Sequence, residues 1–213
     1  MRYRDRREAG RMLVPRLRYL KAHRPVVLGL PHGGVVVADE IAEALAAPLD
    51  ALLIGEIVAP RRPRAVIGAV GEHGVVVSNP ALVRKLGISP GDFGRAAGHA
   101  KAEVARRAAT YHPWSSPVAV GGQTVILVAD GITTGVTVRA AIRVLRARSA
   151  ARIVLAVPVA PLDVLRAVSR HVDQTVCPLP LRRRTAVAPW YHDFRDVAEA
   201  DVLSLLPREH AQP

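Results

Sequence analysis

The residues best suited to chemistry form one run, residues 125–137, in which an apolar segment is followed by an aspartate and a loop of glycines and threonines. The apolar residues 125–128 predict a buried strand, and the helical spacing of apolar residues from Val138 to Leu145 predicts a helix after the loop. Such a loop turns N–H groups and hydroxyls toward one point at a helix N-terminus, which attracts phosphate. Asp130, at the strand tip, can accept hydrogen bonds from a sugar or help to hold a metal.

The same run does not fit two other common phosphate-binding motifs. A Walker A loop needs a lysine before its last serine or threonine, and a dinucleotide fingerprint needs G-x-G-x-x-G, and neither is present here. An ordinary turn between a strand and a helix is the alternative interpretation. The ordered glycine and threonine content favours the phosphate site.

Other reactive side chains are isolated in the sequence. Cys177 lies in an apolar run, which favours a small core residue over a nucleophile, and His73 and His99 are expected to be solvated. His112 is expected to mark a helix end. No Cys/His spacing indicates zinc, and no G-x-S-x-G elbow indicates a hydrolase.

The elements that must position the motif loop alternate between strands and helices. The first part of the chain predicts an amphipathic helix over residues 5–21, which contains Pro15, and then a strand over 25–30. A second helix follows, with Val37, Ile41, Ala44 and Leu45 on its apolar side. The next predicted elements are a strand over 49–58, a β-hairpin over 65–70 and 75–77, and a helix over 92–111. After the motif strand and its helix, the pattern predicts a strand over 152–159, a helix over 162–169 and a strand over 174–179.

This alternation predicts an α/β fold with a mostly parallel twisted sheet and helices on both faces. Ligands of such sheets bind at the carboxyl ends of the strands, so the loops at residues 31–34 and 131–137 are expected to face one pocket. We expect a single domain over residues 1–213, with residues 182–213 as a small hood over the sheet edge. Asp196 to Glu199 is similar to a capping box before a last short helix.

Composition limits the class of protein. Half of the chain is apolar and its formal net charge is +12, but only three of its 30 lysines and arginines are lysines, and the arginines are dispersed along the whole chain. Nucleic acid is therefore not expected as the main partner, although such charge attracts phosphate without specificity. No apolar run is long enough to span a bilayer, the N-terminus has no secretory pattern, and the single Cys177 fits a reducing compartment, so we expect a cytoplasmic protein without membrane contact.

The run at residues 125–137 resembles the phosphoribosyl-pyrophosphate (PRPP) motif of type I phosphoribosyltransferases, in which four apolar residues precede two acidic residues and a Gly/Thr loop. Further segments resemble a group of predicted phosphoribosyltransferases in the same family. These are the arginine-rich start at residues 3–10, the Leu-Pro-His-Gly-Gly loop at 30–34, the hairpin region at 67–72 and the aromatic segment Pro-Trp-Tyr-His-Asp-Phe at 189–194.

The resemblance implies a Mg²⁺-dependent transfer of ribose 5-phosphate from PRPP to an unknown acceptor, often a nitrogen base, with release of pyrophosphate. It implies that Asp130 binds a ribose hydroxyl as the catalytic carboxylate and contacts the metal indirectly. A homodimer is a further expectation of the family. The implied phosphate-binding residues are Gly131, Ile132, Thr133, Thr134, Gly135 and Thr137 for the 5′-phosphate, and His32, Gly33 and Gly34 for pyrophosphate. Trp190 and Tyr191 either stack on the acceptor from the hood or pack the chain's tail.

Three positions differ from the family pattern. Ala129 replaces the first of the two acids, His32 replaces an arginine, and Glu56 stands where this group usually carries a lysine. Each change removes a strong charged contact, worth roughly 1.5–3 kcal/mol, from the same expected pocket. The alternative to an active transferase is therefore a catalytically impaired protein of the same fold that binds PRPP or a nucleotide and has a regulatory role.

Overall fold

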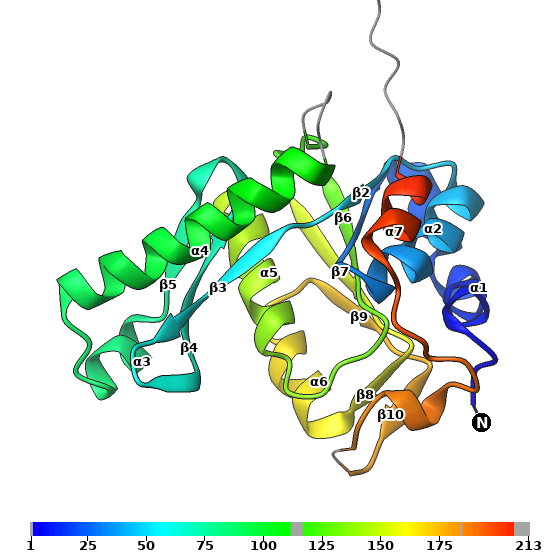
Figure 1. Ribbon diagram of the computed structural model, residues 1–213. Coiled ribbons are helices and arrows are strands. Elements are labelled where there is room, and N and C mark those ends of the chain that lie inside the picture. The colour runs from blue at the N-terminus through cyan, green and yellow to red at the C-terminus, as the bar shows by residue number, and fades with distance from the viewer. Residues whose placement is uncertain (1, 112–116, 184, 207–213) are drawn as a thin grey trace, which may run out of the picture.

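The computed structural model describes residues 2–111, 117–183 and 185–206 (Figure 1). Within these residues a five-stranded sheet with the strand order β2-β1-β6-β7-β9 forms the centre, and every neighbouring pair is parallel. Its strands are β1 (Val26–Gly29), β2 (Leu49–Ala51), β6 (Thr124–Val128), β7 (Arg152–Ala156) and β9 (Gln174–Val176). The predicted α/β class with a mostly parallel sheet is confirmed.

Helices cover both faces of this sheet, which explains why its strands are continuously apolar. Ile126 and Val128 point to the face covered by α1 (Arg6–Leu17) and α2 (Gly33–Leu45), on which α7 (Glu199–Leu205) packs. Val125 and Leu127 point to the opposite face, covered by α5 (Val136–Ala147) and α6 (Leu162–Ser169). None of the described helices combines the length and apolar character needed to cross a membrane.

A second, antiparallel sheet extends from the body as a lobe, at the left of Figure 1. It pairs β3 (Ile54–Ala59), β4 (Arg62–Gly71) and β5 (Val76–Ser78), with a 3₁₀ turn, η2 (Glu72–Gly74), joining β4 to β5. The long helix α4 (Pro90–Tyr111) packs on β3 and β4, and α3 (Pro80–Lys85) follows β5. The predicted hairpin and helix are confirmed here.

The predicted strand over residues 49–58 is wrong, because it divides into β2 and β3, which belong to different sheets. The N–H of Leu52 makes the last bond to β1, at 2.9 Å to the carbonyl of Gly29, and Ile54 already pairs with Gly71 of β4. Leu52 and Leu53 are both buried, so the apolar pattern continues through the break and hides it.

Other boundaries differ for local reasons. The strand predicted over 152–159 stops at Ala156, since Pro158 has no N–H for a ladder, and β8 (Val159–Pro161) pairs instead with β10 (Leu179–Leu181). The first helix ends at Leu17 and continues as the 3₁₀ helix η1 (Arg18–His23). Ala44 is exposed rather than on the buried side of α2. Helix α7 begins after Ala198, whose N–H donates to Asp201 Oδ2 at 3.3 Å, so Asp196 is not its cap.

The strand order fixes where a ligand can bind. From β1 the chain moves first to β2 on one side and later to β6 on the other, so the loops that leave β1 and β6 diverge to opposite faces. The crevice between them, at the carboxyl ends of β1 and β6, is the topological switch point at which α/β sheets hold ligands. Both loops predicted to share a pocket start there.

Two carboxylates are buried among the described residues, Asp50 and Glu72. Asp50 accepts hydrogen bonds from the N–H groups of Ala51 at 2.7 Å and Val118 at 2.8 Å. Burial, assisted by the charge of Asp50, raises the pKa of Glu72 from 4.5 to about 7. The folded protein therefore holds a proton that the unfolded chain releases between these two pH values.

We expect Glu72→Gln to remove a pH dependence of stability. Because the folded pKa of Glu72 lies above its unfolded value, its contribution is fully present below about pH 4.5 and is lost as the pH rises through about 7. Denaturant unfolding at several pH values should show wild type losing at most about 3 kcal/mol relative to Glu72→Gln across this window. The exposed Glu43→Gln is the matched control. Parallel curves for wild type and Glu72→Gln would contradict the assignment.

Candidate functional site

The loop between β6 and α5 surrounds a cavity of about 180 Å³. Gly135 adopts a left-handed conformation, with φ of 71°, at the start of α5, which turns the chain into the helix. The hydroxyl-bearing residues Thr133 and Thr134 are exposed to solvent. The lining residues are Leu30, Pro31, Ala129, Asp130, Gly131, Ile132, Thr133, Thr134, Gly135, Val136, Thr137 and Val138. The residues predicted for the 5′-phosphate are thus gathered around one small cavity, which His32, Gly33 and Gly34 do not line.

One backbone donor of this loop is already engaged. The N–H of Ile132 donates to the carbonyl of Val159 at 3.0 Å, which ties the loop to β8. The same bond removes this amide from the donors that could face a phosphate. Ile132 is therefore a residue that shapes the loop, and its buried side chain packs in the core.

Asp130, at the tip of β6, is held from two sides. Its Oδ2 accepts a hydrogen bond from Arg6 Nε at 2.8 Å, and its backbone carbonyl accepts from the Tyr191 hydroxyl at 2.6 Å. The side chains of Arg6 and Asp130 are only 11% and 24% exposed, so this ion pair is screened less than one on the surface. The carboxylate that the family pattern assigns to the ribose thus has a fixed orientation.

Arg6 is a site residue that the sequence did not reveal. Besides Asp130, its guanidinium donates from Nη1 to the carbonyl of Arg195 at 2.8 Å and lies 3.8 Å from the ring centroid of Phe194. It therefore joins the first helix, the motif strand and the C-terminal segment. Its helical spacing could have indicated that Arg6 faces the body of the protein, since it lies on the same side of α1 as the buried residues Ala9 and Leu13.

The loop after β1 lies directly against Asp130. Gly33 is buried, and a Cβ at this position would lie 2.7 Å from Cγ of Asp130 and would overlap Arg6 Nε as well. At Gly34 a Cβ would lie 2.8 Å from the carbonyl oxygen of Val128. Only glycine permits this approach of the two loops. His32 is exposed at the start of α2, and its peptide bond with Pro31 is cis. The expectation that both loops face one pocket is confirmed.

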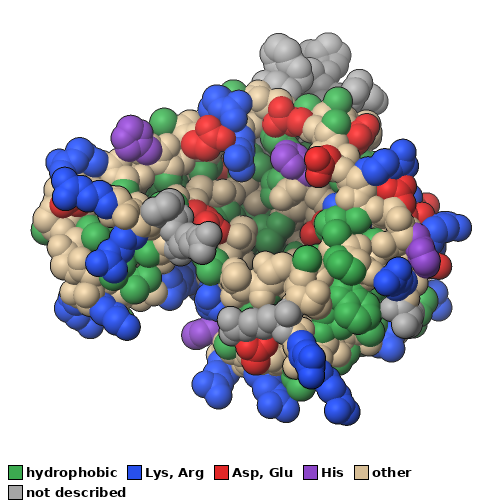
Figure 2. Space-filling view, turned by 60° about the horizontal axis from the view of Figure 1, so that its bottom comes forward, with side chains coloured by type: hydrophobic (Ala, Val, Ile, Leu, Met, Phe, Trp, Pro, Cys, Tyr) green, Lys and Arg blue, Asp and Glu red, His purple; other side chains and the backbone are tan. Residues whose placement is uncertain are grey.

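A second cavity, of about 710 Å³, opens on the other side of Asp130. The body of the molecule is visibly hollowed in Figure 2 beside the lobe formed by the antiparallel sheet. The cavity is lined by Arg6, Pro31, His32, Gly33, Asp130, Thr133, Ala186, Val187, Ala188, Phe194, Asp196 and Val197. It therefore combines the loop predicted to bind pyrophosphate, the motif aspartate and the C-terminal segment.

The aromatic residues of the hood divide into two groups. Tyr191 is buried, with its ring centroid 5.4 Å from that of Tyr3 and 4.9 Å from that of Phe194, and Trp190 is half-buried. Neither Trp190 nor Tyr191 lines either cavity, whereas Phe194 lines the larger one. The hood also rests on the motif loop, since a Cβ on Gly131 would lie 2.6 Å from Cγ2 of Val187.

The three positions that differ from the family pattern surround this site. Ala129 is buried next to Asp130. Glu56, on β3, accepts a hydrogen bond from the Thr137 hydroxyl at 2.6 Å, so its carboxylate lies at the first turn of α5. His32 lines the larger cavity. No group of three or more potential metal ligands occurs in the described part of the chain.

Comparison with known proteins agrees with this architecture. The model of the phosphoribosyl transferase domain matches residues 5–190. This chain belongs to that family. It is 37% identical over 206 residues, 97% of its length, to the Mycobacterium tuberculosis protein named "Putative phosphoribosyl transferase Rv0571c", and equally so to MT0597 of strain CDC 1551. It spans 46% of these relatives, about half of their length.

A solved structure shares the fold closely. The crystal structure of TT1426 from Thermus thermophilus is 37% identical, with a TM-score of 0.89, and the match covers 97% of this chain and 98% of that one. The phosphoribosyltransferase resemblance read from residues 125–137 is therefore confirmed at the level of family and fold. The chain thus has the fold of the phosphoribosyl transferase domain family over nearly its whole length.

Proposed function

We propose that this domain binds PRPP and transfers its ribose 5-phosphate to a nitrogen base, with release of pyrophosphate. The observation that carries the proposal is the contact between the two predicted loops. The motif loop after β6 and the glycine loop after β1 meet at Asp130 with no room for a Cβ at Gly33. A phosphate loop and a second backbone loop beside one carboxylate suit a sugar that carries phosphate groups at two positions.

In this proposal the small cavity takes the 5′-phosphate. The hydroxyls of Thr133 and Thr134 and the loop amides other than those of Ile132 and Val136 would surround it at the N-terminus of α5. The Thr137 hydroxyl would donate its hydrogen bond to the phosphate in place of the Glu56 carboxylate. Gly131 and Gly135 shape the loop, and Ile132 anchors it.

The larger cavity would take the rest of the substrates. Backbone groups of His32 and Gly33, which line this cavity, and of the adjacent Gly34 would meet pyrophosphate, and the permanent charge of Arg6 belongs to the same lining. Asp130, oriented by Arg6, would bind a ribose hydroxyl and stabilise positive charge on the sugar as pyrophosphate leaves. Phe194 and the apolar residues Val187 and Ala188 offer the acceptor base a surface, with Trp190 and Tyr191 supporting it from behind.

The residues present fit Mg²⁺ only as a companion of the substrate. The described residues form no metal cluster of their own, and Asp130 and Glu56 are the carboxylates placed at the loop. Mg²⁺ commonly binds through one or two carboxylates together with substrate phosphates and several waters, and this donor set agrees with that pattern. When bound, the ion would neutralise charge on the pyrophosphate leaving group.

The reaction is tested by release of pyrophosphate. Purified protein with PRPP and Mg²⁺ is incubated with purines, pyrimidines and other nitrogen bases, and pyrophosphate is measured with a coupled assay. We expect release that depends on one acceptor and on Mg²⁺. If every acceptor leaves PRPP intact, transfer to a nitrogen base is rejected.

A second candidate function, binding without turnover, is favoured by specific contacts. Glu56 places negative charge at the motif helix, Ala129 supplies no carboxylate, and His32 supplies no permanent cation. Repulsion between the Glu56 carboxylate and the substrate phosphates opposes productive binding. Weakened contacts at Glu56, Ala129 and His32 together could stop catalysis, while the loop amides still hold a phosphate.

Combining Ala129→Asp, His32→Arg and Glu56→Lys separates the two functions. If the protein is a binder, wild type should bind PRPP without releasing pyrophosphate, and the triple variant should gain turnover. Each restored contact is worth roughly tenfold or more. Thermal unfolding of each variant controls for folding, since Ala129 is buried. Turnover by the unmodified protein would reject the binder.

A further inference from the structure

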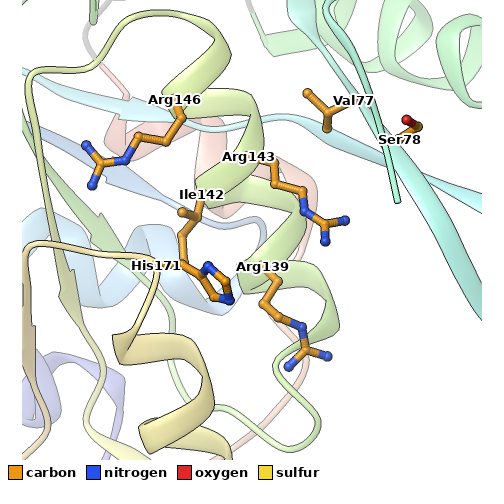
Figure 3. Close-up of a pocket in the computed structure, with 7 residues that line it drawn as sticks. All are labelled: Val77, Ser78, Arg139, Ile142, Arg143, Arg146 and His171. Carbon is orange, nitrogen blue, oxygen red and sulfur yellow. The ribbon is translucent and has the colours of Figure 1, made fainter. Parts of the chain in front are cut away.

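A separate cleft of about 580 Å³ lies between helix α5 and strand β5 (Figure 3). One wall is the outer side of α5 and the other is the edge of the lobe at Val77 and Ser78. The complete lining is Val77, Ser78, Arg139, Ile142, Arg143, Arg146 and His171. None of these residues lines the two cavities at Asp130, so a ligand here would leave the proposed PRPP site unobstructed.

The cleft carries positive charge without an acidic lining residue. Arg139, Arg143 and Arg146 follow each other along one side of α5. Arg146 donates to Asp173 Oδ2 at 2.7 Å and its guanidinium points away from the other two (Figure 3). By contrast, the exposed side chains of Arg143 and His171 make no hydrogen bond or ion pair within the described residues. A concave site whose charged lining residues are all positive raises the local concentration of anions.

The arginines that face the cleft suit linked phosphates. Arg139 and Arg143 are one helical turn apart, or about 6 Å along the axis, so together they can reach adjacent phosphate groups. Guanidinium groups bind phosphate oxygens in bidentate fashion. The half-buried Val77 adds an apolar surface above the buried Ile142, and Ser78 adds a hydroxyl. The volume is that of a small-molecule site, rather than of a surface that follows a nucleic-acid backbone.

The cleft also adjoins the motif loop through one side chain. Nη1 of Arg139 lies 3.4 Å from the position that a Cβ on Gly135 would occupy. Gly135 begins α5 and shapes the phosphate loop. The Arg139 side chain therefore lies beside the residue at which the motif loop passes into α5.

We propose that the cleft between α5 and β5 is a second anion site, which binds the linked phosphates of a small molecule. Two sources share this chemistry, an inorganic polyphosphate and a nucleoside triphosphate. The apolar surface at Val77 distinguishes them, because only the nucleotide can use it.

Calorimetry with tripolyphosphate and with ATP tests the site in the full chain. Arg143→Gln should weaken tripolyphosphate binding roughly tenfold, the cost of one charge-assisted contact. Arg18→Gln removes the same charge from an exposed position on η1 and should change the affinity less than twofold. Thr133→Val, in the motif loop, should leave tripolyphosphate binding at the cleft unchanged.

Each outcome decides the proposal. Tighter binding of ATP than of tripolyphosphate, with the same loss in Arg143→Gln, supports a nucleotide, and equal binding supports a polyphosphate. Loss in Thr133→Val but not in Arg143→Gln would assign the anion to the motif loop and overturn the second site. Equal losses in Arg143→Gln and Arg18→Gln, or no binding of either probe at millimolar concentration, would overturn it as well.

Discussion

Gly33→Ala is expected to abolish PRPP binding at the two loops around Asp130. The added methyl group would overlap Asp130 and Arg6, with 2.7 Å to Cγ of Asp130. Neither group can move freely, because Arg6 is also bonded to Arg195 and stacked on Phe194. The variant must therefore separate the two loops or break the ion pair, and both changes dismantle the proposed pyrophosphate and ribose contacts. Calorimetry with PRPP and Mg²⁺ measures the effect.

Gly94→Ala and Gly98→Ala provide matched controls for the added methyl group. Both glycines lie in α4, and a Cβ on either would meet nothing within 4 Å. Alanine in a helix interior should stabilise the fold by about 0.5–1 kcal/mol and leave PRPP affinity unchanged. If Gly33→Ala binds PRPP as well as these controls do, the close approach of the loops has no role in binding.

Replacing Arg6 should weaken both the hood and the site. Arg6→Met leaves the carboxylate of Asp130 without its partner in a largely buried position, which costs about 1–3 kcal/mol of stability. PRPP affinity should fall roughly tenfold or more, because Asp130 loses its orientation and the cavity its permanent cation. Arg6→Lys should recover only part of this, since an ammonium group cannot bond Asp130 and Arg195 while stacked on Phe194.

The neighbouring Arg7 supplies the control for this series. Arg7 follows Arg6 on α1 and bonds Asp39 and Glu40 of α2, and its side chain is 46% exposed. Arg7→Met should cost no more than about 1 kcal/mol and leave PRPP binding intact. A rise in PRPP affinity in Arg6→Met would show that Arg6 obstructs Asp130 instead of positioning it.

The sequence predicted those parts of the fold that repeat a local pattern. The strand, loop and helix at residues 124–147 were recognisable because buried strands, turn residues and helical spacing follow one another without interruption. The division between β2 and β3 was not recognisable, because Leu52 and Leu53 are as buried as the strands that they separate. The spacing of apolar residues indicates which residues are buried. Here the residues stay buried while the chain passes from one sheet to the other, so the spacing does not show the break.

The candidate site was predicted to a similar extent. Glycine and threonine spacing identified both loops, and the shared edge of a parallel sheet brought them together. Contacts between distant segments could not be read in this way. Arg6 is one of several arginines near the N-terminus, and only the fold brings it to Asp130 and Phe194. Likewise, Glu56 and Thr137 meet because the lobe packs on α5.

Direct binding of PRPP tests the central claim, that the two loops around Asp130 form a site for this sugar phosphate. Titration calorimetry with PRPP and Mg²⁺ should show a binding site in wild type that Gly33→Ala lacks and Gly94→Ala keeps with unchanged affinity. Wild-type protein that shows no heat of binding at millimolar PRPP, while remaining folded, would contradict the account.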